Sequence, residues 1–336
     1  MSLFSRALVT TLPLVPKAAV GKVASHYVAG ETLEEAVAAI RRLDGLGAAA
    51  TVDVLGEEVT ERGKAEAAVA EYERALAAIE AGGLDANVSI KLTMLGLEID
   101  RGFCRDNVER LARAAAGRGN FVRIDMEDAS TTDATLGIYR ELQPRVGNLG
   151  VVLQAYMRRT LADVDDLPAE GANVRLCKGI YVEPRRIAWK GYETVRRNFV
   201  AALAKMLRRG IYAAIATHDE YLVCEARALL DEHRVPRDRY EFQMLLGVDE
   251  QLRDILISEG HRMRIYVPYG TDWYPYSIRR LRENPEVARH VMRATVGRAF
   301  GRNSGRTRGA ADHGFTSGGP KAARPPEDGA SSGGRR

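Results

Sequence analysis

Short hydrophobic runs recur along the chain between about residue 31 and residue 300, and a longer amphipathic stretch follows each run. Runs of this length predict buried strands, and apolar residues at every third or fourth position predict helices. The predicted strands are at residues 48–55, 87–92, 121–126, 150–156, 173–178, 212–217, 240–245 and 263–268. Helical patterns between them include residues 63–81, 106–116, 131–143, 193–209, 220–231 and 249–259.

Strands that alternate with helices predict a parallel sheet covered by helices on its faces. Eight such units in about 270 residues match the size of a (β/α)8 barrel, an α/β fold of the TIM type. A doubly wound open sheet is the alternative, and it favours a glycine-rich fingerprint after the first strand. The first strand here ends Asp53-Val54-Leu55-Gly56 without that fingerprint, which favours the barrel.

Composition divides the chain into three parts. Residues 1–30 contain no acidic residue and are expected to form an N-terminal helical segment, with a mitochondrial presequence as the weaker alternative. Residues 31–300 form the predicted barrel. Residues 301–336 are rich in Gly, Ser, Pro and Arg, which predicts a disordered basic tail. The tail holds seven Lys or Arg and three acidic residues, so it carries the whole formal charge of +4, and no basic face for nucleic acid is indicated.

Other classes of protein are disfavoured by simple counts. No apolar run is long enough to span a bilayer. The three cysteines, Cys104, Cys177 and Cys224, are widely spaced and lack a Cys-x-x-Cys pair. Neither a disulfide framework nor a metal site is therefore predicted, and a reducing, cytoplasmic location is expected.

Two adjacent arginines follow the last predicted strand. Arg279 and Arg280 lie in a predicted helix that begins near Pro275. The helix macrodipole disfavours cations in the first turns of a helix, so a bound anion would account for them. Arginine suits a carboxylate or phosphate because it donates two parallel hydrogen bonds. A solvated basic helix face explains this segment equally well.

Polar residues gather where the predicted strands end. Catalytic groups of such barrels lie at the carboxyl ends of the strands. The residues at these ends are Lys91, Asp125, Glu127, Asp128, Gln154, Arg175, Lys178, Thr217, His218, Glu241, Gln243 and Tyr266. This set is more polar than a packed barrel interior, and jointly it indicates a site.

Seven ordered motifs carry a resemblance to a known family. They are residues 89–93, 123–128, 153–156, 175–181, 216–219, 241–245 and 266–283. With them the chain resembles the proline dehydrogenases, of the monofunctional bacterial type, from about residue 48 to residue 289. The resemblance implies a distorted barrel with FAD at its C-terminal mouth. It also implies oxidation of L-proline to Δ1-pyrroline-5-carboxylate by hydride transfer to flavin N5, the first step of proline catabolism to glutamate.

The resemblance also implies roles for individual residues. Lys91, Arg279 and Arg280 resemble the residues that bind the substrate carboxylate. Tyr266, Tyr276 and Leu245 resemble the walls around the substrate ring. Asp125 and Arg175 correspond to the catalytic positions: the acid pairs with Lys91 and faces the substrate amine, and the arginine lies near flavin N5.

The cofactor-binding residues that the resemblance implies are Met126, Gln154, Arg175, Lys178, Gly179, Ile180, Thr217 and His218. Two positions depart from the family pattern. Ile180 stands where many relatives have a small residue, and Asp219 stands where some have Asn.

The implied partners are L-proline, a membrane quinone that accepts electrons through peripheral contact with the inner face of the membrane, and a separate pyrroline-5-carboxylate dehydrogenase. No nucleic-acid partner is expected. One alternative is a barrel enzyme acting on a phosphorylated small molecule, with the two arginines as a phosphate clamp. Another is a regulatory protein that uses the basic tail to bind nucleic acid.

Overall fold

The structure, a computed structural model, describes residues 21, 24–56, 58–168 and 170–283, and for residues 279–283 it describes the backbone alone. The chain divides into two units, residues 1–296 and 297–336, and every described residue belongs to the first. Most of the N-terminal helical segment predicted for residues 1–30, and the whole basic tail predicted for residues 301–336, lie outside the described residues.

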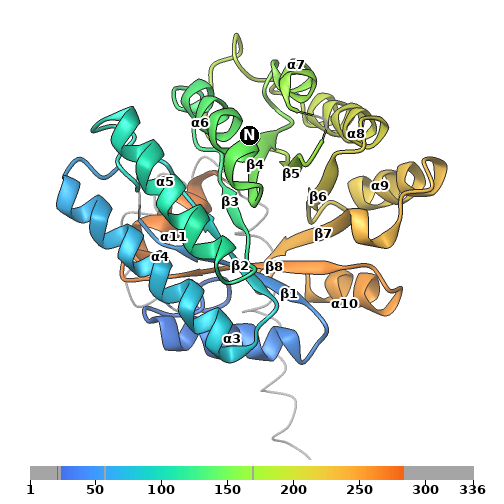
Figure 1. The fold of residues 1–336 in the computed structure, drawn as a ribbon. Helices are drawn as coiled ribbons and strands as arrows, with labels where there is room; N and C mark the ends of the chain where they lie inside the picture. The colour runs from blue at the N-terminus through green and yellow to red at the C-terminus, as the bar shows by residue number, and fades with distance from the viewer. Residues whose placement is uncertain (1–20, 22–23, 57, 169, 284–336) are drawn as a thin grey trace, which may run out of the picture. The chain divides into compact units, whose positions relative to one another are not determined.

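Eight parallel strands form a closed barrel in chain order, with β1 paired to β8 (Figure 1). The strands are β1 (Ala49–Val54), β2 (Ala86–Ile90), β3 (Val122–Ile124), β4 (Leu149–Gln154), β5 (Asn173–Cys177), β6 (Tyr212–Ala216), β7 (Tyr240–Leu245) and β8 (Met263–Tyr269). Each one lies within or beside a predicted apolar run, so the prediction of a (β/α)8 barrel is confirmed.

Helices surround the strands (Figure 1). They are α3 (Leu33–Asp44), α4 (Arg62–Gly82), α5 (Arg101–Ala116), α6 (Thr132–Val146), α7 (Thr160–Asp166), α8 (Tyr192–Arg208), α9 (Glu220–Glu232), the 3-10 helix η2 (Arg237–Arg239), α10 (Glu250–Ser258) and α11 (Trp273–Glu283). Local signals set their ends. A capping box between Thr32 and Glu35 begins α3, and Gly83, in the left-handed region at φ 58°, ends α4.

Apolar and polar side chains alternate along the strands. In β1, Ala50, Val52 and Val54 pack in the apolar core with the helices, whereas Thr51 and Asp53 between them are buried polar residues. Successive side chains of a strand point to opposite faces, so these polar residues face the barrel interior. A hydrogen bond of 3.2 Å from Arg175 to Ser89 joins β5 to β2, two strands that are not neighbours, and so crosses that interior. The barrel therefore has an apolar outside and a polar inside.

Helix α11 follows β8 after a short turn and packs on residues that precede the barrel. Trp273 Nε1 donates a hydrogen bond of 2.7 Å to the Glu31 carboxylate. Tyr276 is buried in a small cluster with Tyr27 and with Leu55, the residue that follows β1. This packing holds α11 next to the carboxyl end of β1, which is the end at which the site is expected.

Candidate active site

Asp125 is the centre of a buried polar cluster at the carboxyl ends of the strands. It directly follows β3 and accepts hydrogen bonds from Ser89 Oγ at 2.7 Å, Arg175 Nη1 at 2.6 Å and the Tyr266 hydroxyl at 2.6 Å. These donors come from β2, β5 and β8. Ser89 and Arg175 bind Oδ1, and Tyr266 binds Oδ2, from which the ammonium nitrogen of Lys91 lies 4.0 Å away. Three of the residues predicted to form the site, Asp125, Arg175 and Tyr266, are therefore in direct contact.

The charge of Asp125 follows from these neighbours. Burial, the largest single effect, raises the pKa of Asp125. The cations Arg175 and Lys91 and the donated hydrogen bonds together lower it by more than burial raises it, so the net pKa lies below the ordinary value of 3.8. Tyr266 is affected in the opposite sense, because burial and the nearby carboxylate of Asp125 raise its pKa well above 10.0. Asp125 is thus an ionised acceptor, and Tyr266 is a neutral donor to it.

Lys91 has a partner that was not predicted. It directly follows β2, and its ammonium group forms a short hydrogen bond with Asp53 of β1, whose side chain is fully buried. Burial raises the pKa of Asp53, against the attraction of Lys91. The expectation that Lys91 pairs with Asp125 therefore describes a longer contact than the one with Asp53. Asp53 could have been found as a lone acid in an apolar strand, since a buried carboxylate requires a partner.

Arg175 is held on two sides. Its Nε donates a hydrogen bond of 2.5 Å to the Gln243 side-chain oxygen, and its Nη1 contacts Ser89 and Asp125. The guanidinium carbon lies 5.1 Å from the centre of the Tyr266 ring. Nη2 has no hydrogen-bond partner among the residues that the structure describes. Although the residue is only 6% exposed, this nitrogen is open to a further acceptor.

The remaining predicted substrate residues lie near the same end of the barrel. Leu245 ends β7, and its backbone N–H donates a hydrogen bond of 2.9 Å to His218 Nε2. Tyr276 lies in α11, with its ring 6.5 Å from that of Tyr27. Arg279 and Arg280 lie in α11 as predicted, but their side chains are outside the described residues, so their carboxylate-binding role stays a prediction.

Asp219 is the centre of a second polar cluster, between β6 and α9. It accepts hydrogen bonds from Arg196 at 2.7 and 2.9 Å, from the Tyr192 hydroxyl at 2.8 Å and from Lys178 at 3.2 Å. Burial raises its pKa, but these donors lower it more, to about 2. Its backbone N–H donates to Thr217 Oγ1 at 3.0 Å. Lys178, Thr217 and His218, predicted to bind the cofactor, thus adjoin one another.

Other predicted cofactor residues have structural partners of their own. Gln154 donates a hydrogen bond of 2.8 Å to the Glu127 carbonyl, and Met126 is buried. Gly179 has φ 101°, and a Cβ there would lie 2.2 Å from the Tyr156 ring, so packing alone requires glycine. Ile180 is half-buried. None of these contacts tests a role in cofactor binding.

Two acids grouped with the site also have local structural roles. Glu127 accepts a hydrogen bond of 3.1 Å from the Thr93 backbone N–H. Asp128 is exposed and accepts a bond of 2.9 Å from the Ser130 backbone N–H, which stabilises the turn before α6.

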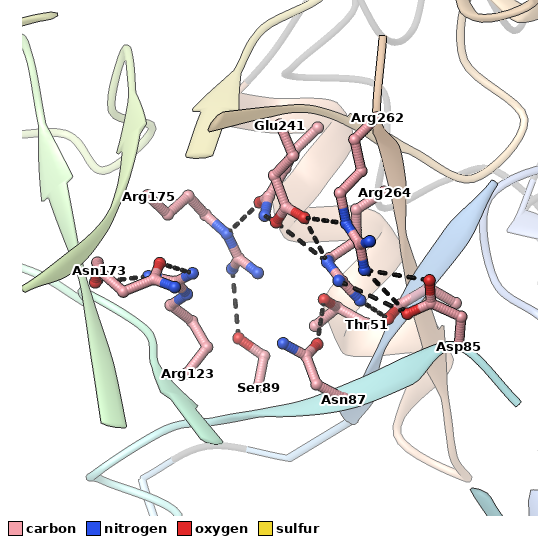
Figure 2. Close-up of polar contacts among 12 residues, drawn as sticks. Thr51, Asp85, Asn87, Ser89, Arg123, Asn173, Arg175, Glu241, Arg262 and Arg264 are labelled. Carbon is pink, nitrogen blue, oxygen red and sulfur yellow. Dashed lines mark hydrogen bonds and ion pairs between the residues drawn. The ribbon is translucent and has the colours of Figure 1, made fainter. Parts of the chain in front are cut away.

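One residue was placed at the wrong end of the barrel. Glu241 is the second residue of β7 and lies at the amino ends of the strands, where Arg264 donates to both of its oxygens at 3.0 Å. Arg262 contacts it at 3.3 Å and bridges to Asp85 at 3.0 Å (Figure 2). These residues line a cavity of about 630 Å³. The six residues of β7 span the barrel from its amino end to its carboxyl end, and residues near the start of the strand were assigned to the carboxyl end together with those at its end.

Comparison with known proteins places the chain in a family. The sequence pattern of the family described as proline dehydrogenase matches residues 36–293. Proline dehydrogenase 1 of Bacillus subtilis subsp. natto is 37% identical over 273 residues, which cover 81% of this chain and 90% of that protein. Proline dehydrogenase of Deinococcus radiodurans is 34% identical over 278 residues, with the same coverage of 81% and 90%.

A solved structure shows the same fold. Proline utilization A from Bdellovibrio bacteriovorus, inactivated by N-propargylglycine, superposes with a TM-score of 0.72 at 24% identity. The match covers 77% of this chain and 32% of that larger chain. No helix among the described residues is long and apolar enough to cross a membrane. With a family match over most of its length and relatives more than 30% identical, the chain belongs to the proline dehydrogenase family, whose members oxidise proline in proline catabolism.

Proposed function

We propose that the cluster around Asp125 binds L-proline, and that FAD binds beside it at the carboxyl ends of the strands. The observation that carries this proposal is the ionised Asp125 carboxylate, whose side chain is 13% exposed and is held by donors from three strands. The product would be Δ1-pyrroline-5-carboxylate.

The charges of the cluster match an amino acid. Asp53 and Asp125 balance Lys91 and Arg175, so the described cluster is formally neutral. Because Lys91 and Arg175 are already paired with carboxylates, the carboxylate of a bound proline needs a further cationic partner. Arg279 and Arg280 of α11 supply that charge in this proposal, and Lys91 adds a point charge beside them. Asp125 then accepts a hydrogen bond from the substrate amine.

The residues present fit a flavin dinucleotide. The open Nη2 of Arg175 offers a buried cationic donor, and Lys178 and Arg196 offer two more cations near the start of α9. This donor set suits a molecule with an electron-accepting ring and a pyrophosphate. When bound, FAD supplies at N5 the two-electron acceptor for the hydride that leaves the proline carbon next to nitrogen.

The protein's own residues contribute positioning and electrostatics. Ionised Asp125 orients the amine. Arg175 places positive charge where negative charge accumulates during the transfer of electrons. Neutral Tyr266 fixes the second oxygen of Asp125 and contributes a ring wall. The proposal extends to a membrane quinone as electron acceptor and to a separate dehydrogenase that consumes the product.

An anaerobic titration tests the proposal. We expect purified protein to be yellow and its flavin absorbance to bleach on addition of L-proline. Protein reconstituted with FAD that does not bleach would refute it. An alternative enzyme for phosphorylated substrates would show no flavin absorbance at all.

The role of the arginines has its own test. Arg280→Met should raise KM for proline about tenfold or more, with unchanged flavin content, because a charge-assisted hydrogen bond contributes about 1.5–3 kcal/mol. Arg227→Met on α9, which removes a half-exposed cation paired with Glu259, is the matched control and should change neither quantity. An equal loss of flavin in Arg280→Met would assign the arginine to the cofactor.

A further inference from the structure

A line of hydrogen bonds joins the amino end of the barrel to the active site. Arg264 binds both oxygens of Glu241 at 3.0 Å. Glu241 accepts a bond of 2.5 Å from the Gln243 side-chain amide, and the Gln243 oxygen accepts one of 2.5 Å from Arg175 Nε. Figure 2 shows Glu241 between the arginines at the amino end of the barrel and Arg175. Arg175 in turn binds Asp125.

Chemistry allows only one orientation of the Gln243 amide. Arg264 and the other surrounding arginines lower the pKa of Glu241 to about 2, although burial raises it, so this carboxylate is an acceptor only. The NH₂ group of Gln243 must therefore face Glu241. Arginine is a donor only, so the oxygen of Gln243 must face Arg175. Both neighbours impose the same orientation, and an amide turned by 180° would lose both hydrogen bonds.

The amide in turn limits where Arg175 can lie. The guanidinium group is planar and rigid, and it is engaged at Nε by Gln243 and at Nη1 by Asp125 and Ser89. Two contacts on different nitrogens define its plane, and they leave Nη2 as the nitrogen open to a ligand. Without the acceptor at Nε, a buried donor would be unsatisfied, and the group would be free to rotate about its contact with Asp125.

We propose that Gln243, oriented by Glu241, is a positioning residue that holds Arg175 in the plane in which its charge stabilises the reduced flavin. The inference rests on the proposed binding of FAD near Arg175. Gln243 and Glu241 contact neither substrate nor cofactor in this proposal, and both act through Arg175.

The reduction potential of the bound flavin is the measurement that tests this role. It is determined by dithionite reduction against a reference dye, so it does not depend on turnover of proline. In Gln243→Leu we expect FAD content near that of the wild type and a reduction equilibrium about tenfold less favourable, which is a potential about 30 mV more negative for two electrons. The value of kcat should fall more than KM rises.

A second variant separates positioning from a direct effect of charge. In Glu241→Gln the new neighbour can donate or accept, so only Arg175 still orients the Gln243 amide. The amide is then held less firmly, and we expect the potential to become more negative as well. A direct effect of the lost negative charge would instead make the potential more positive. In the double variant the potential should equal that of Gln243→Leu alone, because both changes act through one amide.

Gln143→Leu is the matched control. Gln143 is a buried amide in α6 that binds the Leu149 N–H at 2.8 Å and the Gly171 carbonyl at 3.1 Å, away from Arg175. Its loss should lower the melting temperature without changing the potential.

An unchanged potential in Gln243→Leu, or a more positive one in Glu241→Gln, would overturn the inference. If Glu241→Gln does not fold, Gln243→Leu and the control decide. A wild-type protein that binds FAD but is not reduced by proline would contradict the proposed function and leave this comparison intact.

Discussion

Replacing Lys91 by methionine removes the only positive charge that contacts Asp53 among the described residues. The lysine side chain is 8% exposed and that of Asp53 is 0% exposed, so water cannot replace the lost partner. Methionine keeps the length of the side chain and its apolar contacts. The variant therefore isolates the effect of charge on a buried carboxylate.

The expected cost is large for a single substitution. Breaking a buried ion pair from one side costs about 3–5 kcal/mol, because the remaining charge is uncompensated. A domain of this size loses about 2–4 °C of melting temperature per kcal/mol, so we expect a fall of about 10 °C at pH 7. Lys64→Met is the matched control. Lys64 pairs with Glu61 on the surface, with both side chains about two-thirds exposed, and its loss should cost less than about 1 kcal/mol.

The dependence on pH identifies the cause. The pKa of Asp53 is already raised by burial, and Lys91 opposes that rise, so the variant should raise it further. A carboxyl group with a raised pKa in the folded state favours folding at low pH, and the deficit grows as pH rises through that pKa. The difference in stability between wild type and variant should therefore be largest at pH 7 and shrink as pH falls toward the ordinary value of 3.8.

Thermal unfolding followed by circular dichroism at several pH values measures these quantities. Asp53→Asn combined with Lys91→Met should recover much of the loss, since no buried charge is left alone. A melting temperature within about 2 °C of the wild type at pH 7 would refute the reasoning. So would a deficit that does not change with pH, because the cost would then come from packing.

Two further predictions use paired residues. Tyr266→Phe removes a hydrogen bond of 2.6 Å to ionised Asp125 and should lower kcat/KM about ten- to hundredfold, because a bond to a charged group contributes about 1.5–3 kcal/mol. Tyr269→Phe removes an equally short bond from the same strand to Glu71 on the barrel's outer side, and equal kinetic losses in both variants would contradict a special role for Tyr266. Asp219→Asn should lower the free energy of unfolding by about 2 kcal/mol at pH 7, because the pKa of Asp219 is lowered to about 2 in the folded protein. This stabilisation is lost as pH falls below the ordinary value of 3.8, so about half of the difference between wild type and variant should remain at pH 3. Urea unfolding at both pH values measures it, and a loss that is constant between them would show that the charge of Asp219 is not the cause.

The strands and their order were determined by local pattern. Apolar residues such as Val52, Val54, Ile90 and Ile124 recur at the spacing that a strand packed against helices requires, and each run is followed by a helical stretch. In a parallel sheet, a helix must return the chain to the starting edge, so this alternation specifies a parallel sheet covered by helices. The number of units and the lack of a glycine-rich fingerprint after the first strand favoured the barrel over an open sheet. The same pattern locates the strand ends, and with them the polar residues that include Asp125, Arg175 and Tyr266.

Only the tertiary structure decided which of these residues meet. Arg175 and Ser89 are separated by 86 positions, and Tyr266 and Asp125 by 141, and closing the barrel brings each pair into hydrogen-bond contact. The register between β1 and β2 pairs Asp53 with Ser89, just before Lys91, and the lysine bonds Asp53 more closely than Asp125. The sequence pattern specifies on which face of a strand a side chain lies. Its partner across the barrel interior depends on the tilt and register of the strands, which are properties of the whole closed sheet and cannot be derived from one strand.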